Sequence, residues 1–235
     1  MARAEATWVL GLDACKAGWA GICWSGGAAV RGVHGSDVRA AVAAALQVAP
    51  VQVAGIDIPI GLPDSTGRRA DIEARDRLRP HGSRVFATPP RPALEAEAYA
   101  EARVIGRRLS GQGVSAQAYA LRQRVLDVDA YVRDRPAPRV VEVHPELSFA
   151  EMGGAPVAWP KRTWRGQHER RRLLAAQGLA VPDDLGLLGD IAQADDILDA
   201  AAAAWTALRV ARGQAFSLPA TPEVFSDGWP AAIWV

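Results

Sequence analysis

Hydrophobic and polar positions along the first 63 residues follow the pattern of a small sheet. Apolar runs at 8–13, 18–24 and 28–33 are separated by short polar or glycine-containing stretches, which predicts three strands joined by tight connections. A helical pattern follows over 36–48, and the strongly apolar segment 51–63 then predicts a fourth strand. Short connections favour an antiparallel meander for the first three strands, whereas the helical crossover makes the fourth strand parallel to the first.

The segment at about 62–138 has a different character and is predicted to be a mostly helical insertion between the fourth and fifth strands. Its arginine-rich stretches 67–80, 91–110 and 114–136 each predict a helix, and Pro92 suits a first helical position. The insertion makes the chain larger than a minimal sheet domain, but its length still fits one domain over residues 1–235.

The remainder of the chain predicts one further strand and two helices. Residues 139–149 predict a fifth strand, the basic stretch 161–172 leads into a helix, and an alanine-rich helix begins near Asp195. Residues 213–235 are expected to form an irregular tail. These elements together predict an α/β fold with a mixed five-stranded sheet and flanking helices.

Composition narrows the class of protein but not its activity. The chain of 235 residues is 49% hydrophobic and 23% charged, with a net charge of +1, which is ordinary for a globular protein. No apolar run approaches the roughly 18 residues of a membrane span, and Glu5 interrupts the place of a signal-peptide core. We therefore expect a cytoplasmic protein without a membrane partner; its oligomeric state stays open.

The stretch DDILDAAAAAW at 195–205 places three carboxylates at the start of an otherwise apolar helix. Acids in a first turn complement the helix dipole and cap its free N–H groups. Asp199 lies about one turn further in, on the same face as Asp195 and Asp196, and such acids repel unless a cation lies among them. Helix capping and divalent metal binding are therefore both open interpretations.

Two more acids end apolar strands. Asp13 closes the first strand and Asp57 lies near the end of the fourth, so parallel pairing would bring both to one edge of the sheet. Each acid alone could be a turn residue or a structural acceptor. Together with the helix cluster they suggest converging carboxylates, which suit Mg²⁺ or Mn²⁺ and a two-metal phosphoryl-transfer site.

Other candidate residues flank these acids. Glu142 and His144 share a face of the fifth strand, where they could add a ligand or a proton shuttle; a turn-stabilising hydrogen bond between His144 and Glu146 is the alternative. Arginine-rich runs usually form solvated helix faces, but some of their members could also bind phosphate. The candidate substrate-binding residues are Arg84, Arg91, Lys161, Arg162 and Trp164.

Five motifs occur in an order that resembles a known family. They are GLDACKAGW, IDIPIGLP, SRVFATPPRPAL, EVHPELSF and DDILDAAAAAW, and the resemblance covers about residues 8 to 212. The chain resembles the domain of unknown function 429 family, which is described as predicted nucleases with a ribonuclease-H-like fold. This nuclease description rests on likeness of fold, which by itself does not determine activity.

The resemblance implies roles for particular acids. The superfamily's acid on the first strand falls on Asp13, and the one on the fourth strand falls on Asp57. The DxxD pair on the last helix of the Holliday-junction-resolvase branch falls on Asp196 and Asp199, which leaves Asp195 as a cap or a spare ligand. The first helix carries no acid, unlike that of ribonuclease H itself.

The function implied is a nuclease or phosphodiesterase dependent on Mg²⁺ or Mn²⁺. Its catalytic residues would be Asp13, Asp57, Asp196, Asp199, Glu142 and His144, with the four aspartates as metal ligands. Two alternatives remain: a non-enzymatic module that binds nucleic acid or a nucleotide, and a phosphotransferase of the actin-like ATPase or sugar-kinase type. The chain lacks the glycine-rich phosphate loops of the latter. DNA versus RNA, and endo- versus exonuclease action, stay open.

Overall fold

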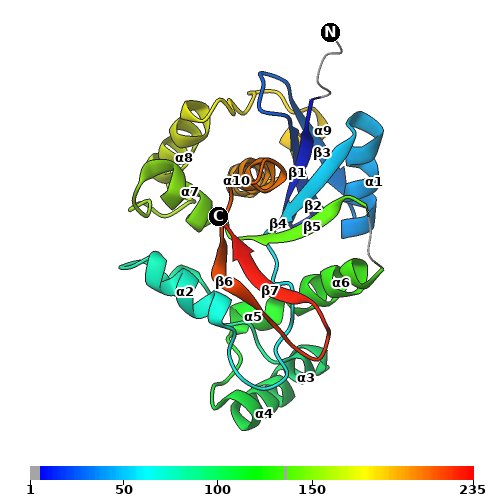
Figure 1. The fold of residues 1–235 in the computed structure, drawn as a ribbon, viewed down its shortest axis with the longest axis vertical. Coiled ribbons are helices and arrows are strands. Elements are labelled where there is room, and N and C mark those ends of the chain that lie inside the picture. Colours follow the sequence, from blue (N-terminus) through cyan, green and yellow to red (C-terminus); the bar gives the residue numbers. More distant parts are fainter. Residues whose placement is uncertain (1–5, 135–136) are drawn as a thin grey trace.

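The computed structural model describes residues 6–134 and 137–235, and within them the chain forms ten α-helices around one mixed seven-stranded sheet (Figure 1). The strands are β1 (Trp8–Cys15), β2 (Gly18–Trp24), β3 (Val30–Gly35), β4 (Val51–Ile56), β5 (Arg139–Val143), β6 (Ser217–Val224) and β7 (Pro230–Trp234). The helices are α1 (Val38–Val48), α2 (Arg69–Arg77), α3 (Arg91–Glu95), α4 (Tyr99–Ser110), α5 (Ala116–Ala120), α6 (Arg122–Arg133), α7 (Pro145–Gly153), α8 (Trp164–Ala176), α9 (Leu187–Ile191) and α10 (Ala194–Ala211), with a 3₁₀ helix η1 (Gly82–Arg84).

The order of strands in the sheet is β3-β2-β1-β4-β5-β7-β6. β1, β2 and β3 form the predicted antiparallel meander, and β4 pairs in parallel with β1, as the helical crossover predicted. The last β1–β4 pair is Leu12 with Ile56, and the N–H of Asp57 then donates to the carbonyl of Leu12 at 3.0 Å. Asp13, which still pairs with Ala20 of β2, and Asp57, which directly follows β4, therefore lie side by side at one edge of the sheet.

The prediction of five strands is wrong at the C-terminal end of the chain. Residues 213–235 were expected to be irregular, but they contain β6 and β7, which extend the sheet to seven strands. β7 pairs in parallel with β5, and β6 covers it as an antiparallel edge strand. Pro219 and Pro222 lie in β6 and Pro230 begins β7, and these are edge and first-residue positions where a missing N–H is tolerated.

Several element boundaries also differ from those predicted. β4 ends at Ile56 rather than residue 63, because the chain bends away into the proline- and glycine-containing segment that follows. β5 ends at Val143 rather than residue 149, because Pro145 begins α7 at a position where proline suits a helix. The helix predicted over 91–110 is divided into α3 and α4, and the one over 114–136 into α5 and α6; its last two residues lie outside the described ranges.

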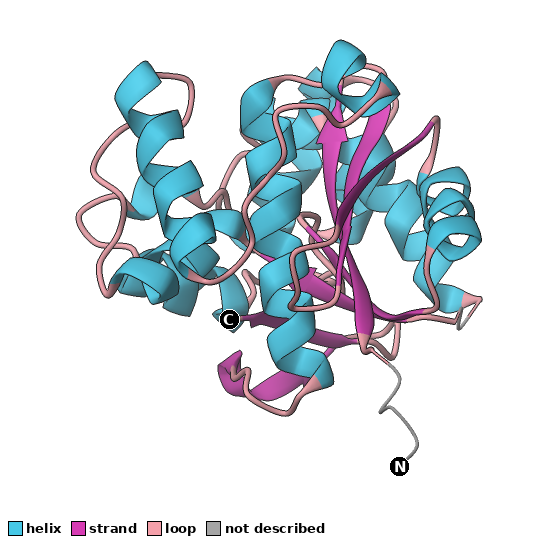
Figure 2. Cartoon of the chain, turned by 90° about the horizontal axis from the view of Figure 1, so that it is seen from above, coloured by secondary structure: helices cyan, strands magenta, loops and turns pink. Residues whose placement is uncertain are grey.

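Helices cover both faces of the central sheet (Figures 1 and 2). α10 packs across β1, β2 and β4, and α7 and α8 pack against it in turn; α1 and α6 lie on the opposite face. The close approach of α10 to the sheet depends on small residues in both, namely alanines in the helix and glycines in the strands. A Cβ atom added to Gly11 of β1 would lie 2.0 Å from the carbonyl oxygen of Ala200, and one on Gly55 of β4 would lie 2.7 Å from that of Ala203.

The helical segment expected over 62–138 does lie between β4 and β5. α2 packs against β6 and β7, α3 to α5 gather at one end of the molecule, and α6 returns to α1 (Figure 1). Among the described residues, no helix combines the length and the apolar character needed to cross a membrane.

Candidate functional site

A cleft of about 590 Å³ opens where β1, β4 and β5 end, beside the first turns of α10. It collects residues that are up to 220 positions apart in the sequence, from Asp13 to Ile233. Its charged and histidine side chains are Asp13, Asp57, Asp71, Arg84, Glu142, His144, Glu146, Lys161, Arg162, Asp196 and Asp199. All six residues predicted to be catalytic therefore line one cleft.

Four aspartates in this cleft repel one another. Burial raises the pKa of Asp13 well above its ordinary value, and the charges of Asp57 and Asp199 raise it further. Burial raises the pKa of Asp57 as well, and it raises that of Asp199 to about 7. The pKa of Asp196 is raised by burial and by its neighbour Asp195. A cluster of carboxyl groups with raised pKa values favours the binding of a further cation.

Among the described residues, Lys161 is the cation that forms an ion pair with one of these four aspartates. Its Nζ lies 2.5 Å from Oδ2 of Asp199, and the side chain comes from the loop between α7 and α8. Burial disfavours the charged ammonium, but Asp199 and Asp13 more than compensate and raise its pKa above the ordinary value. One ammonium against four carboxylates leaves the cluster short of positive charge.

Asp195 is directed away from this cleft. Its carboxylate accepts from Nε of Arg162 at 3.1 Å and lies 4.0 Å from Nζ of Lys161. It lies in the first turn of α10, but the N-cap residue is Gln193, so Asp195 makes no N-cap bond with its side chain. The two basic residues at 161 and 162 thus hold the start of α10 and the α7–α8 loop together.

Glu146, on the first turn of α7, organises a second group of buried charges. Its carboxylate accepts from Arg84 at 2.6 Å and also from the fully buried Arg170. Arg84 donates to the carbonyl of Val157 at 2.7 Å, and Arg170 donates to that of Trp159 at 3.0 Å. This Glu146 cluster therefore fixes the course of the loop that carries Lys161.

Glu142 is the last residue but one of β5, and His144 directly follows the strand. Glu142 accepts from Arg68 at 2.6 Å and from the N–H of Ile60 at 2.7 Å, so its carboxylate is already held by this chain. Nδ1 of His144 is buried and has no hydrogen-bond partner among the described residues. The alternative of a turn-stabilising bond from His144 to Glu146 is not what forms, because Glu146 binds the two arginines.

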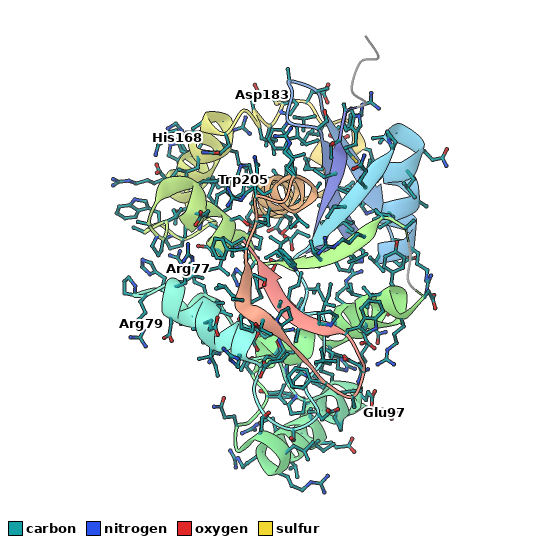
Figure 3. All side chains as sticks on the ribbon, viewed as in Figure 1. Arg77, Arg79, Glu97, His168, Asp183 and Trp205 are labelled. Atoms are coloured by element: carbon teal, nitrogen blue, oxygen red, sulfur yellow. The ribbon has the colours of Figure 1, made fainter. Side chains whose placement is uncertain are left out.

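Two candidate substrate-binding residues lie outside the cleft. Arg91 makes a two-pronged ion pair with Asp129, at 2.8 and 2.7 Å, and also contacts Asp227. Trp164 is 84% exposed and borders a separate hollow on α8. The arginines of 68–91 do not form one surface either, since Arg68 is fully buried while Arg79 projects outward from the end of α2 (Figure 3).

The motifs quoted from the sequence are part of a wider family likeness. The protein-family model described as "Protein of unknown function (DUF429)" matches residues 11–224. The chain belongs to the DUF429 family. That match extends from β1 into the end of β6 and so includes every carboxylate of the cleft. No curated protein and no solved structure matches this DUF429 chain.

The cleft of this DUF429 protein fits a divalent metal in donor chemistry but not in its present arrangement. Carboxylate oxygens are the ligands that Mg²⁺ and Mn²⁺ prefer, and Oδ1 of Asp199 is buried with no hydrogen-bond partner in the part of the chain that the structure describes. However, residues 6–134 and 137–235 contain no group of three or more His, Cys, Asp or Glu side chains gathered closely enough to hold an ion. Binding would require Lys161 to move off Asp199 and the carboxylates to approach one another.

Some residues of the DUF429 cleft were not predicted from the sequence. Thr88 and Gln117 line it, and Oγ1 of Thr88 is buried with no hydrogen-bond partner within residues 6–134 and 137–235, which makes it available to a ligand. Thr88 lies in the FATPPRP motif, where a hydroxyl before two prolines was the available signal. Arg170 gave no signal, because it lies within a run of three arginines and only its burial sets it apart.

Proposed function

We propose that this chain hydrolyses phosphodiester bonds in nucleic acid or a nucleotide, with Mg²⁺ or Mn²⁺ bound in the acid cleft. The observation that carries the proposal is the convergence of Asp13, Asp57, Asp196 and Asp199 at the end of two parallel strands and one helix. Their mutual repulsion and the unpartnered oxygen of Asp199 support a place for added positive charge.

A ribonuclease-H-like core is the finer proposal for the fold. It is supported by the antiparallel meander β1–β3, by the parallel addition of β4 and β5, and by acids at the ends of β1 and β4. The DxxD pair, Asp196 and Asp199, lies on the last helix, α10, as the resemblance to the resolvase branch implies. These features agree with one another although they are far apart in the chain.

Each charged group of the cleft has a chemical role in this proposal. Asp13, Asp57, Asp196 and Asp199 would hold the cation, which when bound supplies an activated water and stabilises the leaving oxygen. Lys161, once released from Asp199, would face a substrate phosphate as a point charge. The unpartnered Nδ1 of His144 could take up or return a proton at the edge of the cleft.

The test is a cleavage assay with purified protein, with Mg²⁺ or Mn²⁺ present. Substrates would be single- and double-stranded DNA, RNA, hybrids, branched junctions and a dinucleotide. Asp13→Asn keeps the shape of the side chain but removes a charge, so we expect activity to fall by at least about 100-fold, as for loss of a group that stabilises a transition state. Asp190→Asn, on the exposed face of α9, is the matched control and should leave activity unchanged.

Activity that persists unchanged in Asp13→Asn would exclude the acid cleft as its source. The absence of cleavage of every substrate would favour the second candidate, a binding module that acts without chemistry. One observation supports that candidate, namely that Lys161 already lies on Asp199 and partly neutralises the cluster. A nucleic acid or nucleotide would then bind without hydrolysis, and its affinity would fall with rising salt.

A further inference from the structure

A second and larger cavity lies in a gap of the sheet and shares only Glu142 with the acid cleft. It has a volume of about 860 Å³ and is bordered by β5, β7, the end of α6 and the loop before β7. The gap exists because β5 pairs with β7 only at Glu142 and Val143, so the earlier part of β5, residues 139–141, has no β7 partner. Strand edges without a partner offer free N–H and C=O groups to a ligand.

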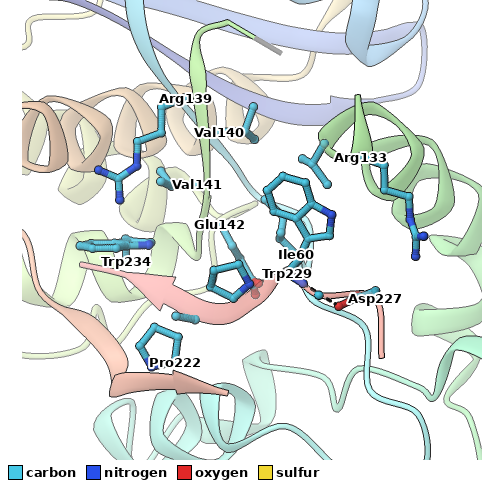
Figure 4. A pocket seen from close by; sticks show the side chains of 14 residues that line it. Ile60, Arg133, Arg139, Val140, Val141, Glu142, Pro222, Asp227, Trp229 and Trp234 are labelled. Atoms are coloured by element: carbon cyan, nitrogen blue, oxygen red, sulfur yellow. Dashed lines mark hydrogen bonds between the residues drawn. The ribbon is translucent and has the colours of Figure 1, made fainter. Parts of the chain in front are cut away.

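Each side of this cavity contributes one indole and one guanidinium (Figure 4). Arg139 lies over the ring of Trp234, 5.2 Å from its centre, on one side. Trp229 and Arg133 lie on the other side, with Glu142 between the two pairs in this view. Because Arg139 covers Trp234, the indole of Trp229 is the ring left for an aromatic ligand.

The charge of the cavity favours an anion. Glu142 and Asp227 also border it, but their carboxylates are held by Arg68 and Arg91. Arg139, by contrast, has no carboxylate within ion-pair distance among the described residues, and Arg133 shares Asp129 with Arg91. The charge of Arg133 is therefore balanced within this group, and Arg139 is the guanidinium of the cavity that remains available to a phosphate group.

We propose that this tryptophan cavity binds a nucleoside monophosphate. The base would stack on Trp229, and the phosphate would bind to Arg139. Aromatic stacking on tryptophan and bidentate arginine contacts are the two interactions that nucleotides use most generally. A cavity of this volume lies within the ordinary range for small-molecule sites. This inference concerns a site separate from the acid cleft and does not depend on hydrolysis there.

Isothermal titration of the full chain with adenosine monophosphate tests the proposal, with chelator present and no divalent metal. Parallel titrations use adenosine alone and ribose 5-phosphate alone. We expect the monophosphate to bind at least about tenfold more tightly than either fragment, because both the ring and the anion are recognised. Equal binding of ribose 5-phosphate would overturn the stacking on Trp229, and equal binding of adenosine would overturn the arginine contacts.

Three variants locate the binding. Arg139→Met keeps the stem that packs on Trp234 but removes the charge, and should weaken binding about tenfold or more. Arg31→Met is the matched control, because Arg31 also stacks on a tryptophan, Trp8, but on the opposite edge of the sheet. Asp13→Asn should bind as the wild type does; a changed affinity in it would place the nucleotide in the acid cleft and overturn the proposal. The absence of any heat at millimolar nucleotide would overturn it too.

Discussion

Two groups of buried charges lie next to each other in this molecule and differ in their balance. In the Glu146 cluster, one carboxylate faces two guanidiniums, which also bind backbone carbonyls. In the acid cleft, four carboxylates face one ammonium, and the pKa of Asp13, Asp57 and Asp199 is raised by burial. A group of balanced charges stabilises the structure, whereas a surplus of negative or positive charge leaves a place for a ligand of the opposite charge.

The largest expected effect comes from breaking the balanced group. Glu146→Gln leaves Arg170, which is fully buried, without its carboxylate. We expect the free energy of unfolding to fall by roughly 3–5 kcal/mol, as for the loss of one partner of a buried ion pair. Urea denaturation measures this change.

The matched control for this change is Glu169→Gln, which breaks the more exposed pair with Arg172. Its effect should stay within about 0.5 kcal/mol, because exposed pairs contribute little. Equal stability of Glu146→Gln and the wild type would mean that the loop carrying Lys161 is held by other contacts.

An intermediate effect is expected when the acid cleft loses its internal cation. Lys161→Met removes the ammonium that lies on Asp199 and leaves four acids uncompensated. We expect a loss of about 1–3 kcal/mol in stability at pH 8, the range for leaving a buried charged group without its partner. The same variant should bind Mn²⁺ more tightly than the wild type, because no ammonium competes for Asp199.

Metal titration followed by the shift in melting temperature separates this role of Lys161 from a general role in folding. A variant that is destabilised but binds Mn²⁺ no better than the wild type would contradict the competition. Arg162→Met serves as control, because Arg162 pairs with Asp195, which does not line the cleft, rather than with Asp199.

The smallest expected effect is a gain of stability. Asp13→Asn removes one of the repelling charges, so we expect the metal-free protein to become more stable by about 1 kcal/mol at pH 8, the scale of a typical single substitution. The same change should weaken metal-induced stabilisation. A destabilised Asp13→Asn protein without metal would show that Asp13 is held by favourable contacts rather than by repulsion.

This gain should depend on pH in a defined direction. The carboxyl of Asp13 keeps its proton to higher pH in the folded chain than in the unfolded chain, because its pKa is raised on folding. The unfolded chain then binds fewer protons from about pH 4 upward, so the wild type loses stability as pH rises through this window. The pKa of Asp199, about 7, extends the window to neutral pH. Melting curves between these limits should therefore diverge for wild type and Asp13→Asn.

The acid cleft was predictable from the sequence because its parts follow from local patterns. Apolar runs that end in Asp13 and Asp57, joined by a helical crossover, are enough to bring both acids to one edge. The Glu146 cluster was not predictable as a unit, because Arg84, 62 residues away, was predicted only to bind substrate, and Arg170, 24 residues away, resembles the arginines beside it. Burial alone distinguishes Arg170, and burial is a property of the assembled fold.

Strands β6 and β7, at the end of the sheet, were not predicted for a different reason. Prolines at 219, 222 and 230 interrupt the alternation that marks a strand, so residues 213–235 gave a weak signal. The tryptophan cavity went unpredicted with it, because Trp229 and Trp234 belong to the same segment. The break between α3 and α4 has no local cause in sequence, since the residues at 96–98 are ordinary helix formers.

The glycines under α10 have a consequence for how this chain can change over time. Gly11 and Gly55 let the alanine run of that helix rest directly on the sheet, which sets the depth at which Asp196 and Asp199 stand. A single methyl group at Gly11 would meet backbone, so the helix would have to lift and take its acids with it. The glycines and alanines between the sheet and α10 therefore set the positions of the acids although they carry no functional group. Substitution of one of them would alter the reactivity of the cleft while every reactive side chain is retained.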